Sequence, residues 1–227
     1  MIPIRRLASP AVLQENRQKW TAAFLEKRAK DSNARPSSKQ YAHPDIVSTL
    51  ETMGHCKCFY CEQSTKQTKA EVDHYIEVAD KPALAFEWEN LYRACWDCNH
   101  KKTPNSSIAA AKCLDPCDPE VRPSEHLAFE SEIIRAKSNS SVGLKTIQKY
   151  KLDRPDLDYK RLKQLQRFDL VLLDIRNRQV SESRQTMTES EKGLLGRFLQ
   201  ADYPFSLMFS YYLSGLGMDD SIDRPEE

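Results

Sequence analysis

The chain has 227 residues, of which 40% are hydrophobic and 30% are charged. This balance is typical of a soluble globular protein, and the length allows one or two domains with substantial cores. No apolar run approaches the roughly 20 residues needed to cross a bilayer, and residues 1–6 lack the apolar core of a signal peptide. We therefore expect a cytoplasmic protein without a membrane-spanning segment, whose seven cysteines are reduced.

The net charge of +1 conceals a strong segregation of charge along the chain. Residues 1–40 carry nine Lys and Arg against three acidic residues, and residues 137–184 carry twelve against six. Residues 113–136 and 185–227 are acidic instead. Basic segments of this kind favour contact with a nucleic-acid backbone, although each one is equally typical of a solvated helix face.

The N-terminal part of the chain is expected to be mainly helical. Ser9 and Pro10 have the pattern of an N-cap followed by proline at the first helical position, so we expect a helix that runs to about Lys30. Residues 31–40 are rich in Ser, Asn and Pro and predict a loop. A second, short helix is expected over residues 43–53. The face that the first helix would bury consists of Leu13, Trp20, Phe24 and Leu25.

Two Cys-x-x-Cys pairs follow, Cys58 with Cys61 and Cys95 with Cys98. Such pairs suit four-coordinate zinc, which accepts thiolate ligands and has no d-electron preference to satisfy. Thirty-three residues separate the two pairs, more than the roughly 15–20 of a simple zinc ribbon. We therefore expect a functional segment inside the zinc loop.

Three further cysteines lie outside these pairs. Cys56 could substitute as a ligand, but the spacing of Cys58 and Cys61 forms the better zinc turn. Cys113 and Cys117 are most simply buried thiols. A site closed by four thiolates leaves no open position, so the zinc is expected to be structural, and any catalysis would belong to a second metal ion.

The segment inside the zinc loop has the pattern of a hairpin followed by a helix. Val72, His74 and Ile76 alternate with other residues, which is typical of a short, half-buried strand. Residues 89–92 are the candidate for the returning strand. Asn99 directly follows the last cysteine and begins a polar, lysine-bearing segment that is expected to be helical.

This order of motifs resembles that of an HNH, or ββα-metal, nuclease. The motifs are the first cysteine pair, Asp73-His74, Asn90-Leu91, the second cysteine pair and Asn99. The resemblance implies a β-hairpin and a helix that zinc clamps at their base. It also implies that this core brings four residues together at a catalytic site: Asp73, His74, Asn90 and Asn99.

The resemblance implies a role for each of these residues. His74 would be the general base that deprotonates the attacking water, a task suited to an imidazole that titrates near neutral pH. Asp73 and Asn99 would hold a catalytic Mg²⁺ or Mn²⁺ ion. His100 could compete with Asn99 as a ligand, but the spacing from the preceding cysteine favours Asn99. Asn90 would either accept the ring proton of His74 or hold the loop and so fix the tautomer.

Two neighbouring lysines complete the candidate site. Lys102 matches the lysine that often follows three residues after the motif Asn or His, and with Lys101 it is a candidate for contact with nucleic-acid phosphate. The glycines often found between the two strands of the family motif are absent, and residues 80–83 read Asp-Lys-Pro-Ala instead. The pattern therefore leaves the shape of this loop open.

The C-terminal half is expected to be mostly helical. Residues 104–107 would stop the helix after the zinc site, residues 113–129 have a loop-like composition, and Ile133-Ile134 suggests a strand. Helices are expected over residues 142–152, from Arg154-Pro155 to about Val180, and to Leu199 after the Thr188-x-x-Glu191 capping box. Residues 204–216 are the most apolar stretch, and they fit a core helix better than a surface for docking a partner.

The sequence thus predicts a mostly helical α+β protein, with a zinc-clamped ββα-metal core flanked by N- and C-terminal helices. The predicted division is a helical segment at 1–54, the nuclease core at 55–112 and a mainly helical region at 113–227. The layout also resembles the HNH subunit of Septu-type and retron-linked anti-phage defence systems. The residues that carry this wider likeness are Ile2-Pro3-Ile4-Arg5, Cys58-Phe59-Tyr60-Cys61-Glu62, Trp88-Glu89-Asn90-Leu91, Leu114-Asp115-Pro116, His126-Leu127-Ala128-Phe129 and Leu152-Asp153-Arg154-Pro155.

This wider resemblance implies a nuclease that works in defence with an ATPase of the ABC or SMC-like type. The substrate would be DNA or RNA, since one phosphodiester chemistry serves both. The alternative interpretation is a non-catalytic zinc module that binds nucleic acid or protein. The presence of Asp73, His74 and Asn99 together favours the nuclease, because a module without catalysis could have lost any of them.

Overall fold

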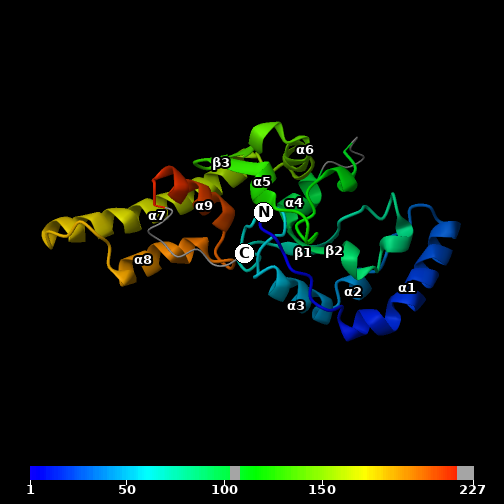
Figure 1. Ribbon diagram of the computed structural model, residues 1–227. Coiled ribbons are helices and arrows are strands. Elements are labelled where there is room, and N and C mark those ends of the chain that lie inside the picture. The colour runs from blue at the N-terminus through cyan, green and yellow to red at the C-terminus, as the bar shows by residue number, and fades with distance from the viewer. Residues whose placement is uncertain (103–107, 219–227) are drawn as a thin grey trace.

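The computed structural model describes residues 1–102 and 108–218. Residues 104–107, predicted to stop the helix after the zinc site, lie outside the described part. The β1–β2 hairpin and α4 lie near the middle of the molecule, with α1 and α3 on one side and α7 and α8 on the other (Figure 1). Within the described residues the helices are α1 (Ala11–Lys30), α2 (Ser38–Tyr41), α3 (Pro44–Met53), α4 (Trp96–Lys101), α5 (Pro123–His126), α6 (Ser141–Tyr150), α7 (Pro155–Ser181), α8 (Glu189–Gly196) and α9 (Ser206–Gly215).

Two antiparallel pairs of strands complete the described fold, β1 (Ala70–His74) with β2 (Leu91–Cys95) and β3 (Leu127–Glu130) with β4 (Ile133–Ala136). The mostly helical α+β class is thereby confirmed. In the first hairpin, Asp73 lies opposite Tyr92 and His74 lies opposite Leu91. The chain then continues directly from β2 into α4, which gives the ββα order that the sequence predicts.

The strand boundaries of the first hairpin differ slightly from prediction. The first strand begins at Ala70 and ends at His74 rather than at Ile76. The returning strand begins only at Leu91, because Trp88–Asn90 forms a 3₁₀ turn. The Asn90 carbonyl oxygen still accepts from the Tyr75 N–H at 2.9 Å, which holds this residue beside the loop that follows β1.

The N-terminal helices bear out most of the sequence prediction. The first helix begins at Ala11, with Pro10 as its N-cap residue. Trp20 packs against Phe86, with 5.7 Å between the ring centroids. Leu25, expected on the buried face, is 38% exposed, because successive helical residues point about 100° apart and the neighbouring Phe24 takes the inward position. The second predicted helix is α3, which ends before Gly54 as expected.

The loop predicted for residues 113–129 is wrong at its C-terminal end. That end forms α5 and β3, and β3 pairs with β4 from Leu127↔Ala136 to Glu130↔Ile133. The Tyr211 hydroxyl donates to the carbonyl oxygens of Ser124 and Leu127, and so ties α9 to this hairpin. The contact between this hairpin and α9, which lies far along the chain, could not be predicted from the local sequence.

The long helix and the capping box are confirmed. The helix α7 begins at Pro155 as predicted. At α8 the Thr188 hydroxyl accepts from the Glu191 N–H, and the Glu191 carboxylate accepts from the Thr188 N–H.

The most apolar segment, residues 204–216, forms the core helix α9. Its Phe209 is fully buried and lies 5.7 Å from the Phe168 ring of α7. Most of its large apolar side chains face the interior, which favours the core helix over a partner-docking patch, although Leu216 at its end is 40% exposed. The buried residues of this helix are Ser206, Leu207, Met208, Phe209 and Leu213.

Candidate active site

The four predicted cysteines come together in one buried cluster. Their Sγ atoms all lie within 4.8 Å of one another. Cys58 and Cys61 lie on the turn after α3, Cys95 ends β2, and Cys98 lies in the first turn of α4. The Cys95 sulfur also accepts from the Cys98 N–H at 3.4 Å, which helps to cap α4. The cluster thus joins the base of the hairpin to the start of the helix.

This donor set fits a structural zinc ion. Four clustered, buried thiol groups can supply the closed thiolate shell that tetrahedral zinc prefers. The remaining cysteines lie outside the cluster. Burial raises the pKa of Cys113 to about 11 and that of Cys117 to about 12, so both are protonated thiols at neutral pH. The expectation that these two are not ligands agrees with their placement.

An arginine from the far side of the zinc loop contacts this cluster. Arg154 Nη1 lies 3.5 Å from the Sγ of Cys98. Burial opposes the charge on Arg154, but the neighbouring Cys98, Cys61 and Cys95 sulfurs outweigh it and raise the pKa of the guanidinium. Since α7 begins at the next residue, the C-terminal helices are attached directly to the zinc cluster.

The carboxylate of Asp73 is buried, and both of its oxygens contact neighbouring groups. Asp73 is 5% exposed, and its Oδ2 accepts from the Tyr60 hydroxyl at 2.7 Å. Lys102 Nζ lies 3.2 Å from Oδ1 and 3.3 Å from Oδ2. The same amine donates to the His74 carbonyl oxygen at 2.7 Å. Lys102 therefore neutralises Asp73 inside the core.

This placement corrects the expected phosphate contact of Lys102. The residue is only 7% exposed, and its amine points at buried oxygen atoms rather than at solvent. Lys101 lies on the surface instead, 3.3 Å from carboxylate oxygens of both Asp97 and Asp156. Contact between Lys101 and nucleic acid stays a prediction.

The imidazole of His74 is held in one orientation by a backbone carbonyl. Its Nε2 lies 2.9 Å from the oxygen of Ala85. A carbonyl oxygen can only accept, so Nε2 carries the hydrogen and Nδ1 carries the free lone pair. The ring of Tyr41 packs edge-on against His74, with 4.7 Å between the centroids.

Burial also keeps this imidazole neutral. It lowers the pKa of His74, and this effect outweighs the Ala85 hydrogen bond and the Asp73 charge, which act in the opposite direction. A neutral ring with a fixed tautomer is the form that can accept a proton at neutral pH. The geometry thus leaves Nδ1 as the basic atom of the site.

Asn90 holds the loop that carries this carbonyl. Its Oδ1 accepts from the Ile76 N–H at 2.7 Å, and its Nδ2 donates to the oxygens of Ile76 and Leu84 at 3.0 and 3.1 Å. Direct contact with the His74 ring, one of the two expected roles, is wrong, because the Ala85 carbonyl takes that position. The other role, holding the loop, agrees with the contacts, since Leu84 directly precedes Ala85.

Asn99 is linked to the same strand through a glutamate. Its Nδ2 donates to Glu71 Oε2 at 2.9 Å, which leaves the Asn99 Oδ1 as a free acceptor. Glu71 and Asp73 lie two residues apart on β1 and therefore on one side of the strand. His100 stacks on Trp96, and its Nδ1 donates to the Trp96 carbonyl oxygen at 3.0 Å.

These donors fit a second, oxygen-bound metal ion. Each carboxylate oxygen has about two acceptor positions, and Asp73 Oδ1 uses one of them for Lys102, so one remains. With the Asn99 Oδ1 it would offer two of the hard oxygen donors that Mg²⁺ takes. Lys102 and such an ion would share the Asp73 carboxylate.

Several residues of the site escaped the sequence analysis. Glu71 could have been found, because the period-2 pattern places it on the same side as Asp73. Tyr60 lies inside the zinc turn and carries no signal of its contact with Asp73. Tyr41 and Arg154 come from distant segments. The contact of Ala85 is made by its backbone carbonyl, so the type of side chain at this position does not predict it.

Comparison with known proteins identifies the class to which this ββα core with its four-cysteine cluster belongs. The model of the HNH endonuclease family matches residues 56–105. The chain is also 30% identical over 211 residues to the Septu protein PtuB of Bacillus mycoides (strain KBAB4), covering 77% of this chain and 70% of that protein. The chain therefore belongs to the Septu PtuB family, and it carries an HNH endonuclease domain.

A second relative gives the same family name over a shorter region. The Septu protein PtuB of Bacillus thuringiensis is 29% identical over 140 residues, which cover 60% of this chain and 49% of that protein. The matched region thus spans about half the length of this second relative. Among the helices of the described residues, none is both long and apolar enough to cross a membrane.

Proposed function

We propose that the protein is a metal-dependent endonuclease that hydrolyses phosphodiester bonds in DNA or RNA as the effector of an anti-phage defence complex. Membership of the Septu PtuB family supports the role in defence. The HNH domain at residues 56–105 supports phosphodiester hydrolysis as the reaction. An ABC or SMC-like ATPase is the proposed partner, in a Septu or retron-linked system.

The contact of His74 with Ala85 carries this proposal. The Nε2–H bond to the Ala85 oxygen aims Nδ1 away from the loop and fixes it as the unprotonated nitrogen. In the proposed reaction Nδ1 takes the proton from the water that attacks phosphorus. Asn90 donates a hydrogen bond to the Leu84 carbonyl oxygen and so helps to hold the loop that carries Ala85.

Asp73 and Asn99 are the residues proposed to hold the catalytic ion. When bound there, Mg²⁺ or Mn²⁺ would stabilise negative charge on the scissile phosphate and on the leaving oxygen. The bond from Asn99 Nδ2 to Glu71 turns the amide so that its oxygen stays free for a ligand. His100 is the weaker candidate, because its ring stacks on Trp96 and its Nδ1 donates to the Trp96 carbonyl oxygen, which leaves only Nε2 for a metal ion.

One observation favours the alternative of a non-catalytic zinc module. Lys102 and Tyr60 surround the buried Asp73 in the way that a purely structural carboxylate is satisfied. In that interpretation Asp73 stabilises the packing of α4 on the hairpin, and the site cleaves nothing. Activity of the purified protein distinguishes the two functions.

The test is cleavage of end-labelled DNA and RNA by the purified protein, alone and together with the proposed ATPase partner. We expect cleavage in Mg²⁺ or Mn²⁺, its loss in EDTA, and its loss in a His74→Ala protein. Zinc content is measured after the EDTA treatment, because loss of the structural ion would also stop the reaction. A folded, zinc-loaded protein that cuts neither substrate with the ATPase present supports the non-catalytic module.

A further inference from the structure

The long helix α7 exposes large apolar side chains on the side opposite to its core contacts. Its buried positions include Leu165, Phe168 and Leu172, which face the rest of the fold. Leu170 and Leu173 lie next to each other on this side of the helix, and large apolar side chains exposed side by side mark a candidate interaction site. The exposed apolar residues of this helix are Tyr159 at 59%, Leu170 at 67%, Leu173 at 54% and Val180 at 80%.

These residues lie in a heptad pattern. The positions 159, 163, 166, 170, 173, 177 and 180 follow one another in steps of four and three residues, the a and d spacing of a coiled coil. Leu170 and Leu173 form the apolar centre, with Gln166 before them and Asn177 after them. A helix with this stripe fits a second helix that packs along its length.

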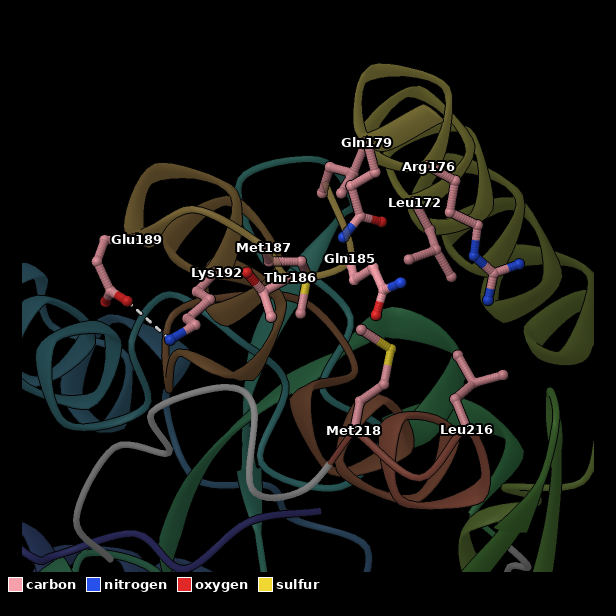
Figure 2. A pocket seen from close by; sticks show the side chains of 11 residues that line it. Leu172, Arg176, Gln179, Gln185, Thr186, Met187, Glu189, Lys192, Leu216 and Met218 are labelled. Atoms are coloured by element: carbon pink, nitrogen blue, oxygen red, sulfur yellow. Dashed lines mark hydrogen bonds and ion pairs between the residues drawn. The ribbon is translucent and has the colours of Figure 1, made fainter. Parts of the chain in front are cut away.

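A groove lies on the side of α7 that faces α8. It has a volume of about 660 Å³ and is lined by Leu172 and Gln179 of α7 and by Met187 and Met218 (Figure 2). Arg176 also lines this groove. The stripe centred on Leu170 lies away from this groove, because Leu172 belongs to the buried positions of the helix.

The charges beside the stripe are self-complementary in one orientation. Arg167 and Asp174 flank it on one side, and Asp169 and Arg176 flank it on the other. In an antiparallel pair with Leu170 opposite the Leu173 of a second copy, heptad geometry places each arginine opposite an aspartate. The facing residues are Arg167 with Asp174 and Asp169 with Arg176, and two-fold symmetry repeats each pair.

A parallel pair is disfavoured by the same charges. In parallel heptads a g position faces the e position five residues further along the other helix. Asp169 would then face Asp174 of the second copy, and like charges at this distance repel. The pattern therefore selects the antiparallel arrangement.

The flanking residues are available for such contacts. Within the described residues Arg167 and Arg176 form no ion pair. Among the described residues, Asp169 accepts only from the Tyr212 hydroxyl, at 2.9 Å. Asp174 pairs with Arg178 one turn along the same helix. This pair is 65% and 44% exposed, and such surface pairs are weak enough to exchange.

We propose that α7 is the interface of a homodimer, in which a second copy of the chain packs antiparallel along the Leu170 stripe. An antiparallel helix pair has two-fold symmetry, so the same surface of both copies forms the interface. Such an interface is complete with two copies and adds no further ones. Each zinc-containing core is joined to the N-terminal end of its α7 through Arg154 and Cys98. The two cores would then lie at opposite ends of the pair, roughly 50 Å apart along the axis.

The first test is the molar mass of the wild-type protein by sedimentation equilibrium between about 1 and 100 µM. A dimer is expected, and the double variant Leu170→Glu/Leu173→Glu should weaken it at least 100-fold and give a folded monomer. Leu194→Glu is the matched control, because Leu194 is 46% exposed on α8, away from the stripe. Circular dichroism checks that each variant keeps its helices.

A charge exchange tests the register. Arg167→Asp alone should weaken the dimer about tenfold, because it creates two like-charge contacts per dimer. Combining Arg167→Asp with Asp174→Arg should restore the wild-type dissociation constant, since the pair is inverted but kept. A wild-type monomer over the whole concentration range overturns the proposal, as does a dimer that survives Leu170→Glu/Leu173→Glu.

Discussion

Arg154 donates a hydrogen bond to Cys98, with 3.5 Å between Nη1 and Sγ, across 56 residues of chain. Four thiolates around one Zn²⁺ ion leave a net negative charge in the interior, which burial would otherwise disfavour. The guanidinium offsets this charge and places the start of α7 against the zinc site. We therefore expect zinc binding and docking of the C-terminal helices to be coupled.

We expect Arg154→Met to weaken zinc retention. The substitution keeps most of the side-chain volume but removes the charge and the hydrogen bond to Cys98. Loss of a group that supports metal ligands typically lowers affinity by roughly 10- to 100-fold. The measurement is transfer of zinc to a colorimetric chelator, and Arg154→Lys should retain an intermediate affinity. Equal zinc release from the wild-type, Arg154→Met and Arg154→Lys proteins would show that the guanidinium does not contribute to zinc affinity.

Removal of the zinc should unfold the core. Structural zinc sites supply on the order of 10 kcal/mol of apparent free energy, and the four cysteines join the hairpin to α4. Cys95→Ser should therefore give a protein with little zinc that aggregates or loses its near-ultraviolet circular dichroism. Cys56→Ser is the matched control, because this thiol lies outside the cluster and its loss should leave zinc content unchanged.

The zinc cluster and the ββα order were predictable because they depend on local spacing. Two Cys-x-x-Cys turns predicted the metal cluster, and the alternation around His74 predicted the first strand. The Thr188 and Glu191 capping box likewise rests on contacts within one turn, and the structure confirms it. Such features depend only on residues that are close together in the sequence.

Features that depend on distant contacts could not be read from the sequence. Lys102 looked like a surface cation, and only the fold shows that Asp73 and the His74 carbonyl draw its amine inward. The Ala85 carbonyl that orients His74 belongs to the backbone, so the residue type at position 85 does not predict this contact. The β3 strand forms because β4 and α9 cover it, although its own segment resembled a loop.

Two glycines in helices should respond oppositely to alanine. A Cβ at Gly143 would lie 2.3 Å from the His126 carbonyl oxygen, so Gly143→Ala must push α5 and α6 apart. We expect a loss of about 1–3 kcal/mol in the free energy of unfolding. At Gly193, nothing lies within 4 Å of the added Cβ, so Gly193→Ala should gain up to about 1 kcal/mol from helix propensity. Urea unfolding of the two variants measures both changes.

Asn90→Ala should damage both stability and cleavage. The side chain makes three hydrogen bonds to Ile76 and Leu84, and their loss should cost about 2–4 kcal/mol in the free energy of unfolding. The loop would also release the Ala85 carbonyl from His74, so the proposed cleavage should fall further than stability alone explains. Asn90→Asp keeps the acceptor for the Ile76 N–H and should be intermediate in urea unfolding. Wild-type cleavage by a folded Asn90→Ala protein would contradict this positioning role.

His74→Ala and Asp73→Ala should separate base chemistry from metal binding. Loss of a positioned general base costs roughly 10² to 10⁴ in rate. His74→Ala should leave zinc content unchanged and lower the thermal stability only modestly, through loss of the Ala85 hydrogen bond. Asp73→Ala should be equally inactive, but it also leaves Lys102 as a buried charge without its partner, so its thermal stability should fall.

The divalent-ion dependence of the two variants then decides between their roles. Excess Mg²⁺ or Mn²⁺ should partly restore cleavage in a conservative Asp73→Asn protein, which keeps one oxygen ligand, and should not restore His74→Ala. Asn99→Ala should behave like the Asp73 variants in this titration, whereas His100→Ala should stay close to wild type. If a correctly folded His74→Ala protein cleaves at the wild-type rate, the imidazole is not the base. The buried Asp73–Lys102 pair would then be a structural feature of a zinc module that binds without cutting.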